Sequence, residues 1–227
     1  MRCAHLFSLL LLGLAPALPA GTITGTISAR GAPEAADAGA GGGAYQSRRY
    51  KFAERLDYDR LTDFVVSIDE PMAIVAPPDA KPAAITTQRN AMFDPHVLPV
   101  AVGTVVKWPN EDEIYHNVFS MSDAKEFDLG LYHQEKIPLL TFDKVGRVDV
   151  FCAIHSQMHC IVLVLPNPYF AKADGNRRYV IKDVPAGTYK LKAWHERLPS
   201  QVKEVVVPAQ GEVRVDFVLG LGQLPKY

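Results

Sequence analysis

One short segment, VFCAIHSQMHC, gathers side chains that bind soft metal ions. Cys152, His155 and Met158 stand three residues apart. Val148, Val150 and Cys152 alternate along a predicted strand, so the thiol should point into the interior where that strand ends. The loop that follows supplies an imidazole and a thioether, and the three side chains can therefore converge on one ion. Thiolate, imidazole and thioether together suit copper in both of its oxidation states.

A second imidazole comes from the upstream segment KWPNEDEIYHNVFS. A predicted strand ends at Trp108, and His116 opens the next one. The separation of 36 residues from His116 to Cys152 (152 − 116 = 36) leaves room for several strands that return the thiol beside the imidazole. A trigonal plane of two imidazoles and a thiolate, with a weak axial thioether, is the blue-copper arrangement. A closed zinc site is disfavoured because zinc makes little use of Met. The alternative that the Cys and Met lie in a core strand and loop by chance stays open.

Short strands must position these residues, because the chain lacks amphipathic patterns long enough for a substantial helix. Pro, Gly, Asn and Asp separate the strand segments throughout. The clearest alternation is EVRVDFVL, which predicts a half-buried strand. Its inward residues are Val213, Val215, Phe217 and Leu219, and its outward residues are Glu212, Arg214 and Asp216. The predicted fold class is all-β.

The segment FDPHVLPVAVGTVVKWPNEDEIYHNVFS, followed by FDLG and TFDKVGRVDVFCAIHSQM, resembles cupredoxins of the plastocyanin and amicyanin type. The resemblance covers residues 82–166 and implies a Greek-key sandwich. The short C-x-x-H-x-x-M loop is most similar to that of amicyanin, and the continuation into NPYFAKAD and AWHE resembles bacterial methylamine-utilisation or plastocyanin-like proteins. The resemblance implies that Asn117 ties two ligand loops together and that electrons pass through a partly exposed His155. It also implies one Cu(I)/Cu(II) ion with the ligands His116, Cys152, His155 and Met158.

The flanking segments resemble a different sandwich, the carboxypeptidase regulatory-like or transthyretin-like domain. GTITGTIS and FVVSID supply its first strands, and ADGNRRYVIKDVPAGTYKLKAW and VKEVVVPAQGEVRVDFVL supply its last. The matching residues are Asp174, Tyr179, Pro185, Gly187, Tyr189 and Leu191. We therefore expect a discontinuous transthyretin-like domain over residues 21–81 and 167–227, with the cupredoxin domain, 82–166, inserted into it.

The first twenty residues, 1–20, predict a secretory signal peptide. Arg2 precedes an apolar run from Leu6 to Leu14, and small residues follow. The run is too short to span a bilayer, although an uncleaved anchor stays open. We expect a protein of the periplasm without membrane insertion. The formal net charge of -1, from 24 Lys and Arg against 25 Asp and Glu, gives no field that would attract nucleic acid.

Two further segments lie between the predicted signal and the first domain's second strand. The stretch 31–44, GAPEAADAGAGGGA, predicts a flexible loop because it cannot bury enough apolar surface to order itself. Residues 45–63 are charged and aromatic and predict a short helix with no interpretable motif.

Cys160 and four other histidines leave alternatives open. Cys160 begins CIVLVL, which is apolar on both faces, so it is either a buried free thiol or the disulfide partner of Cys152. A second copper site would have to draw on the remaining histidines, and the His195-Glu196 pair after Trp194 is the segment that could face the inserted domain. Scattered histidines more often lie at the surface or in hydrogen bonds. The histidines concerned are His96, His133, His159 and His195.

These features predict a periplasmic one-electron carrier rather than an enzyme, with a redox partner such as a c-type cytochrome or a periplasmic oxidoreductase. We expect Phe119, Phe151 and Ile154 to keep water from the copper. The alternative is a copper-binding protein for storage or delivery that uses the same ligands. An enzyme with a second metal centre is disfavoured because the sequence displays no further tight cluster of ligands.

Overall fold

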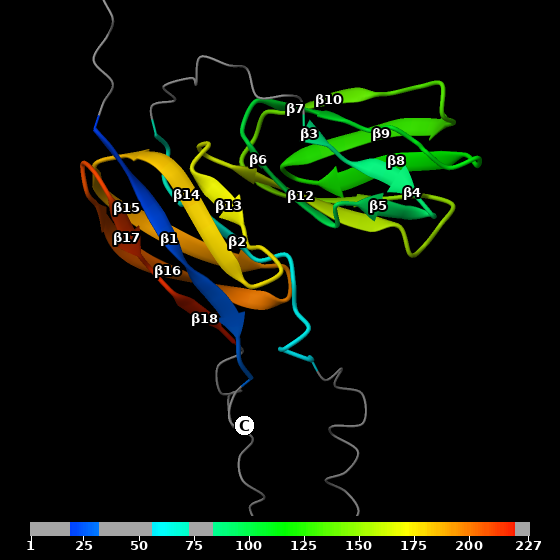
Figure 1. The fold of residues 1–227 in the computed structure, drawn as a ribbon. Helices are drawn as coiled ribbons and strands as arrows, with labels where there is room; N and C mark the ends of the chain where they lie inside the picture. The colour runs from blue at the N-terminus through cyan, green and yellow to red at the C-terminus, as the bar shows by residue number, and fades with distance from the viewer. Residues whose placement is uncertain (1–18, 32–55, 73–83, 221–227) are drawn as a thin grey trace, which may run out of the picture.

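The computed structural model describes residues 19–31, 56–72 and 84–220. These residues form strands joined by turns and loops, without a helix, which confirms the all-β class. Figure 1 shows the strands in two groups that lie side by side. We call β1, β2 and β13–β18 the terminal sandwich, and β3–β12 the central sandwich.

The terminal sandwich consists of two four-stranded sheets that share one core. β1 is the central strand of the first sheet: it pairs antiparallel with β14 and parallel with β17 and β18. The second sheet has the order β13-β2-β15-β16. Strand bounds in the first sheet are β1 (Ala20–Ala29), β14 (Arg178–Pro185), β17 (Glu212–Arg214) and β18 (Phe217–Leu219). Those in the second are β13 (Phe170–Lys172), β2 (Val65–Ile68), β15 (Gly187–His195) and β16 (Leu198–Val207).

The central sandwich holds the predicted metal ligands. Its five-stranded sheet has the order β6-β12-β11-β8-β9, beside a three-stranded sheet, β10-β7-β3, and the pair β4-β5. The five-stranded sheet contains β6 (Val97–Ala101), β12 (His159–Leu165), β11 (Gly146–Phe151), β8 (His116–Ser122) and β9 (Lys125–Tyr132). The others are β10 (Leu139–Phe142), β7 (Thr104–Lys107), β3 (Ala84–Ile85), β4 (Thr87–Arg89) and β5 (Met92–Asp94). Trp108 and Phe142 are among the fully buried side chains of its core.

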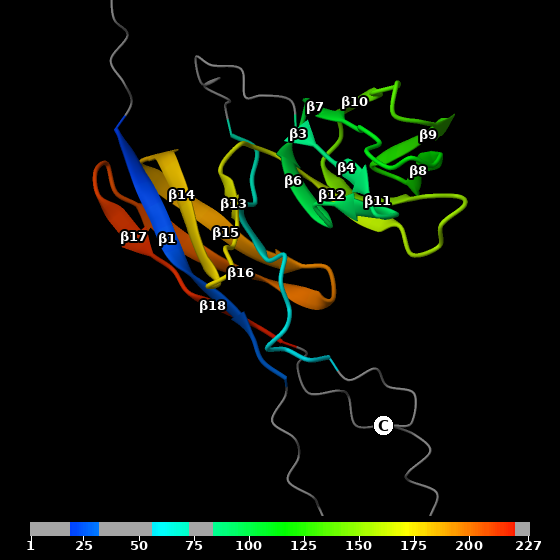
Figure 2. The same cartoon turned by 45° about the vertical axis from the view of Figure 1, so that its right-hand side comes forward.

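Strand β12 joins the two sandwiches because both of its faces are buried. Cys160, Val162 and Val164 point into the core of the central sandwich. Ile161, Leu163 and Leu165 pack in a separate apolar cluster with residues of the terminal sandwich, among them Val65 and Trp194. Figure 2 shows β12 and β6 on the side of the central sandwich that faces β13. The run CIVLVL, apolar at every position, is therefore the sequence of an interface strand.

Two of the predicted elements can be compared with the structure in detail. EVRVDFVL keeps its alternation, with Phe217 and Leu219 buried, but it forms two short strands that are interrupted at Val215 and Asp216. In the segment 45–63, which could form a short helix, residues 56–63 contain a turn and no helix, and the rest lies outside the described residues. Residues 1–18 of the predicted signal, most of the predicted loop, and 45–55 lie outside the described residues. The domain boundaries and the transthyretin-like resemblance stay predictions.

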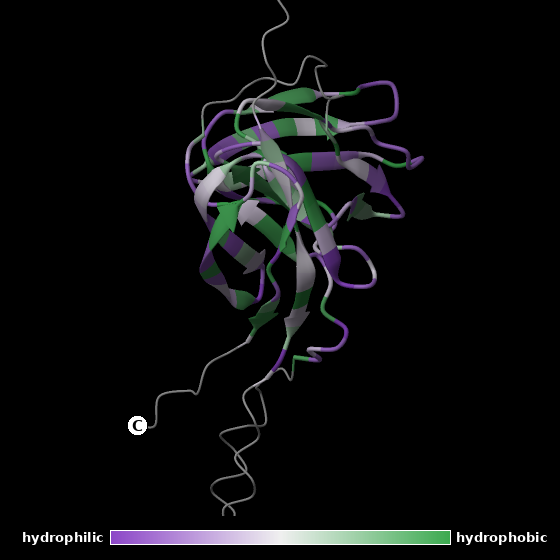
Figure 3. Ribbon diagram, turned by 60° about the vertical axis from the view of Figure 1, so that its left-hand side comes forward, coloured by the Kyte–Doolittle hydropathy of each residue, from purple (hydrophilic) through white to green (hydrophobic). Residues whose placement is uncertain are grey.

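In Figure 3 most loops are polar, while the strands alternate apolar segments with polar ones. This distribution fits sheets that bury one face each. Among the described residues there is no helix with the length and apolar character needed to cross a bilayer.

Candidate metal centre

The cysteine loop leaves β11 and returns as β12. Val148 and Val150 on β11 are fully buried, and Cys152, two residues further on, is buried as well. The Cys152 amide donates to the Met158 carbonyl over 3.3 Å, and the Met158 amide donates to the His155 carbonyl over 3.0 Å. These bonds close a tight turn that carries all three downstream ligand candidates.

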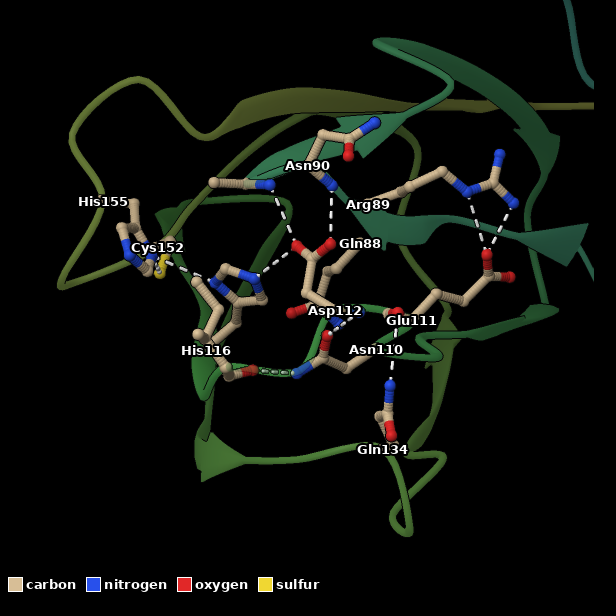
Figure 4. Close-up of polar contacts among 12 residues, drawn as sticks. Gln88, Arg89, Asn90, Asn110, Glu111, Asp112, His116, Gln134, Cys152 and His155 are labelled. Carbon is tan, nitrogen blue, oxygen red and sulfur yellow. Dashed lines mark hydrogen bonds and ion pairs between the residues drawn. The ribbon is translucent and has the colours of Figure 1, made fainter.

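His116, Cys152 and His155 converge from two distant segments of the chain. Their donor atoms all lie within 4.8 Å of one another. Nδ1 of His116 is 3.0 Å from Nδ1 of His155, which in turn is 3.7 Å from Sγ of Cys152. His116 is fully buried at the start of β8, whereas His155 is partly exposed on the loop (Figure 4).

The donor set is of a kind that can bind a metal ion. Two imidazole nitrogens that both carry lone pairs repel each other at 3.0 Å unless a proton or a cation lies between them. A thiolate beside two imidazoles is a donor set that copper accepts in both oxidation states.

Asp112 fixes which nitrogen of His116 faces the site. Nε2–H of His116 donates to the Asp112 carboxylate over 2.8 Å, which leaves Nδ1 with the lone pair. The backbone amides of Asn90 and Ala91 donate to the same carboxylate over 2.6 and 2.9 Å (Figure 4). Burial alone would raise the pKa of Asp112, but these three donors hold it below its usual range. Sequence reasoning missed Asp112 because it is one of three consecutive acids in NEDEIYH.

Asn117 bonds to both ligand segments. Its backbone amide donates to Sγ of Cys152 over 3.5 Å, and its side-chain oxygen accepts from the Ala153 amide over 3.3 Å. Its side-chain nitrogen donates to Asp128 over 2.7 Å. The segment after His116 and the cysteine loop are thereby held in one arrangement.

Met158 is fully buried and belongs to the same apolar cluster as Cys152. The expected water-excluding shell was wrong in its members, because Phe151 and Ile154 are exposed and Phe119 is half-buried. The residues that share the cluster with the thiol are buried ones on neighbouring elements. They include Trp108, Val118, Tyr132, Val150 and Val162.

Both cysteines of the described chain are free. Cys160 lies opposite Val150 across the β11–β12 ladder rather than opposite Cys152, so the alternative of a disulfide between them is wrong for this structure. Desolvation raises the pKa of the Cys160 thiol well above its usual value. Cys160 is therefore an inert core thiol, whereas Cys152 lies at the edge of the core.

Four further histidines lie among the described residues. His133 lies near Glu135, with 3.5 Å between Nδ1 and the carboxylate, and His195 is buried against the ring of Phe64. Neither joins a ligand cluster among the described residues. His96 and His159, in contrast, come together with Glu196, so the expectation of no further tight ligand cluster was wrong.

No protein-family model matches the chain, and no curated protein matches it in sequence. Solved structures of copper proteins do match it in part. A copper-containing nitrite reductase from Thermus scotoductus SA-01 matches with 24% identity and a TM-score of 0.36, over 42% of this chain and 25% of that chain. This chain thus spans about a quarter of that enzyme.

Two smaller proteins match over nearly their whole length. A purple cupredoxin from Nitrosopumilus maritimus has 22% identity and a TM-score of 0.33, and the match covers 36% of this chain and 98% of that one. The reduced state of an amicyanin mutant has 27% identity and a TM-score of 0.34, over 44% of this chain and 97% of that one. All these TM-scores are below 0.5, so the matches support no conclusion about ligands or activity.

Proposed function

We propose that this protein is a type 1 (blue) copper protein that carries one electron at a time. His116, Cys152 and His155 would form the trigonal plane, and Met158 would be the weak axial ligand. The observation that supports the proposal is the convergence of two Nδ1 atoms and one thiol sulfur within 4.8 Å. We also propose that the protein works in the periplasm and is not an enzyme.

Copper, when bound, would supply the change between two oxidation states. The task of the protein is to keep the ligands in nearly one geometry, so that little nuclear motion accompanies the change of charge. Asp112 holds the His116 ring, and Asn117 holds the cysteine loop and donates its amide to the Cys152 sulfur. A hydrogen bond to sulfur and exclusion of water both tune the potential of such a site.

Electrons would enter and leave at the side of His155. This imidazole is partly exposed, whereas His116 is fully buried, so a partner can approach only the former. Ile154 and Tyr115, which are 53% and 59% exposed, are the neighbours in sequence of His155 and His116. We propose that a redox protein, such as a c-type cytochrome or a periplasmic oxidoreductase, docks at this loop.

The test is the visible spectrum of the purified chain after addition of Cu(II). We expect an intense band that arises from the Cys152 thiolate and disappears in Cys152→Ser. Cys160→Ser is the matched control, because Cys160 is buried with a raised pKa and should leave the band in place. An unchanged spectrum in Cys152→Ser would refute the assignment. Copper bound without a reversible potential would instead support storage or delivery.

A further inference from the structure

A second group of potential metal ligands lies where the two sandwiches meet. His96 precedes β6, His159 opens β12, and Glu196 lies in the turn between β15 and β16. Their donor atoms are all within 4.8 Å of one another. Two of the residues therefore come from the central sandwich and the third from the terminal sandwich.

The contacts of His96 direct its Nε2 at a carboxylate. Nδ1 of His96 is 3.2 Å from the backbone carbonyl of His159, which can only accept, so Nδ1 carries the hydrogen. Nε2 lies 3.1 Å from both carboxylate oxygens of Glu196. It donates to them if the ring is an imidazolium, and in a neutral ring it holds a lone pair. A neutral ring and a carboxylate repel each other in this arrangement unless a proton or a metal cation joins them.

His159 is oriented in the opposite sense by a second carboxylate. Its Nε2 is 2.9 Å from Asp149, so Nε2–H donates and Nδ1 keeps the lone pair. Arg147 donates to the same carboxylate over 2.7 and 2.9 Å. Burial opposes the ionisation of Asp149, yet the bonds from Arg147 and His159 hold its pKa below the usual range. A carboxylate that orients a ligating imidazole in this way is a common feature of metal sites.

We propose that His96, His159 and Glu196 bind a divalent transition-metal ion of the zinc type. Two imidazoles and one carboxylate, with a fourth position open to water, form a ligand set that zinc accepts. The side chains of His96, His159 and Glu196 are 37%, 26% and 21% exposed, which leaves room for that water. The ion would join the two sandwiches, and the proposal does not depend on copper at the first site.

Calorimetric titration of the full chain with Zn²⁺ tests the proposal. The titration uses Cys152→Ser as background, which removes the thiolate of the first site. We expect a bound equivalent of Zn²⁺ that Glu196→Gln weakens by more than about 100-fold, since loss of an outer partner alone costs roughly 10–100-fold. Glu135→Gln is the matched control, because Glu135 pairs with the surface His133. Zn²⁺ binding that is absent, or is indifferent to Glu196→Gln, would overturn the site.

Nitrogen NMR of the histidine rings gives a second readout that does not depend on stoichiometry. Addition of Zn²⁺ should shift Nε2 of His96 and Nδ1 of His159, while the ring of His133 stays unchanged. The variant Asp149→Asn should bind Zn²⁺ about 10–100-fold more weakly and retain the fold, as near-ultraviolet circular dichroism would verify. Shifts confined to other histidines would contradict the proposed ligands.

Discussion

At the scale of single residues, the first site depends on which nitrogen of His116 keeps its lone pair. Asp112 accepts from two backbone amides and from Nε2–H of His116. Asparagine at position 112 would place its own N–H groups against one of these donors. We expect Asp112→Asn to lower copper affinity about 10–100-fold, measured by competition with a Cu(I) chelator. Glu111→Gln is the control, because Glu111 pairs with Arg89 at the surface, and equal affinities in both variants would disprove this role.

The axial position provides a second prediction at this scale. Met158→Leu removes the proposed weak sulfur donor but keeps an apolar side chain of similar size in the buried cluster. The intense colour should remain, because it arises from the thiolate, and the reduction potential should rise. Voltammetry measures the change, with Met121→Leu as control because Met121 is 79% exposed. A potential that is equal in both variants would remove Met158 from the ligand set.

The residues that the sequence identifies for each site are those whose types are rare and closely spaced. Cys152 and His155 lie on one short loop, and the strand alternation before them correctly predicts a buried thiol. The sequence singled out the His195-Glu196 pair as a segment that could face the inserted domain. It could not assign Glu196 as a ligand, because 100 residues separate it from His96 and a turn glutamate has no distinctive pattern. Its neighbour His195 was the histidine to which the sequence drew attention, but that ring is buried against Phe64.

At the scale of elements, the interruption between β17 and β18 is a feature that the alternation of apolar and polar residues does not predict. β1 pairs with β17 and then with β18, and Gly25 passes the break so closely that a Cβ there would lie 1.8 Å from the Val215 carbonyl oxygen. The amide of Thr26 has no partner in β17 or β18 at this point and donates to the Asp216 carboxylate over 2.7 Å. Alternation survives the break, so the sequence predicts the buried face correctly but not the interruption.

The Asp216 carboxylate makes this junction sensitive to pH. Hydrogen bonds from Arg214 and from Thr26 lower the pKa of Asp216 to about 2. This folded-state pKa lies below the unfolded value of about 3.9. The ionised carboxylate therefore stabilises the folded protein fully above about pH 4, and this stabilisation is lost as the pH falls towards 2. Asp216→Asn should reduce stability at pH 7 by on the order of 1 kcal/mol or less, because solvent screens the pair.

Urea denaturation at pH 7 and pH 2 measures this difference between Asp216→Asn and the unaltered protein. The gap should be present at pH 7 and should close at the lower pH. Glu212→Gln on the neighbouring strand is the control, since its carboxylate is exposed. A gap of equal size at both pH values would show that the charge of Asp216 does not stabilise the junction.

At the scale of the whole molecule, β12 couples the two sandwiches through its outward face. Ile161 is fully buried in the cluster that contains Val65 and Trp194, whereas Val162 is fully buried in the core of the central sandwich. Truncation of a buried isoleucine to alanine costs about 2–5 kcal/mol. For Ile161→Ala this loss falls on the interface. We expect the unaltered protein to unfold in one thermal transition and Ile161→Ala in two.

Differential scanning calorimetry measures the transitions, and Val162→Ala is the matched control. Because Val162 faces the central core, its truncation should lower the melting temperature of the central sandwich without removing contacts between the sandwiches. Two transitions in Ile161→Ala and a single lowered transition in Val162→Ala would separate coupling from core packing. A single shifted transition in Ile161→Ala would show that the coupling does not depend on Ile161, and that the remaining apolar contacts and the polar contacts at His96, Lys172 and Glu196 hold the sandwiches together.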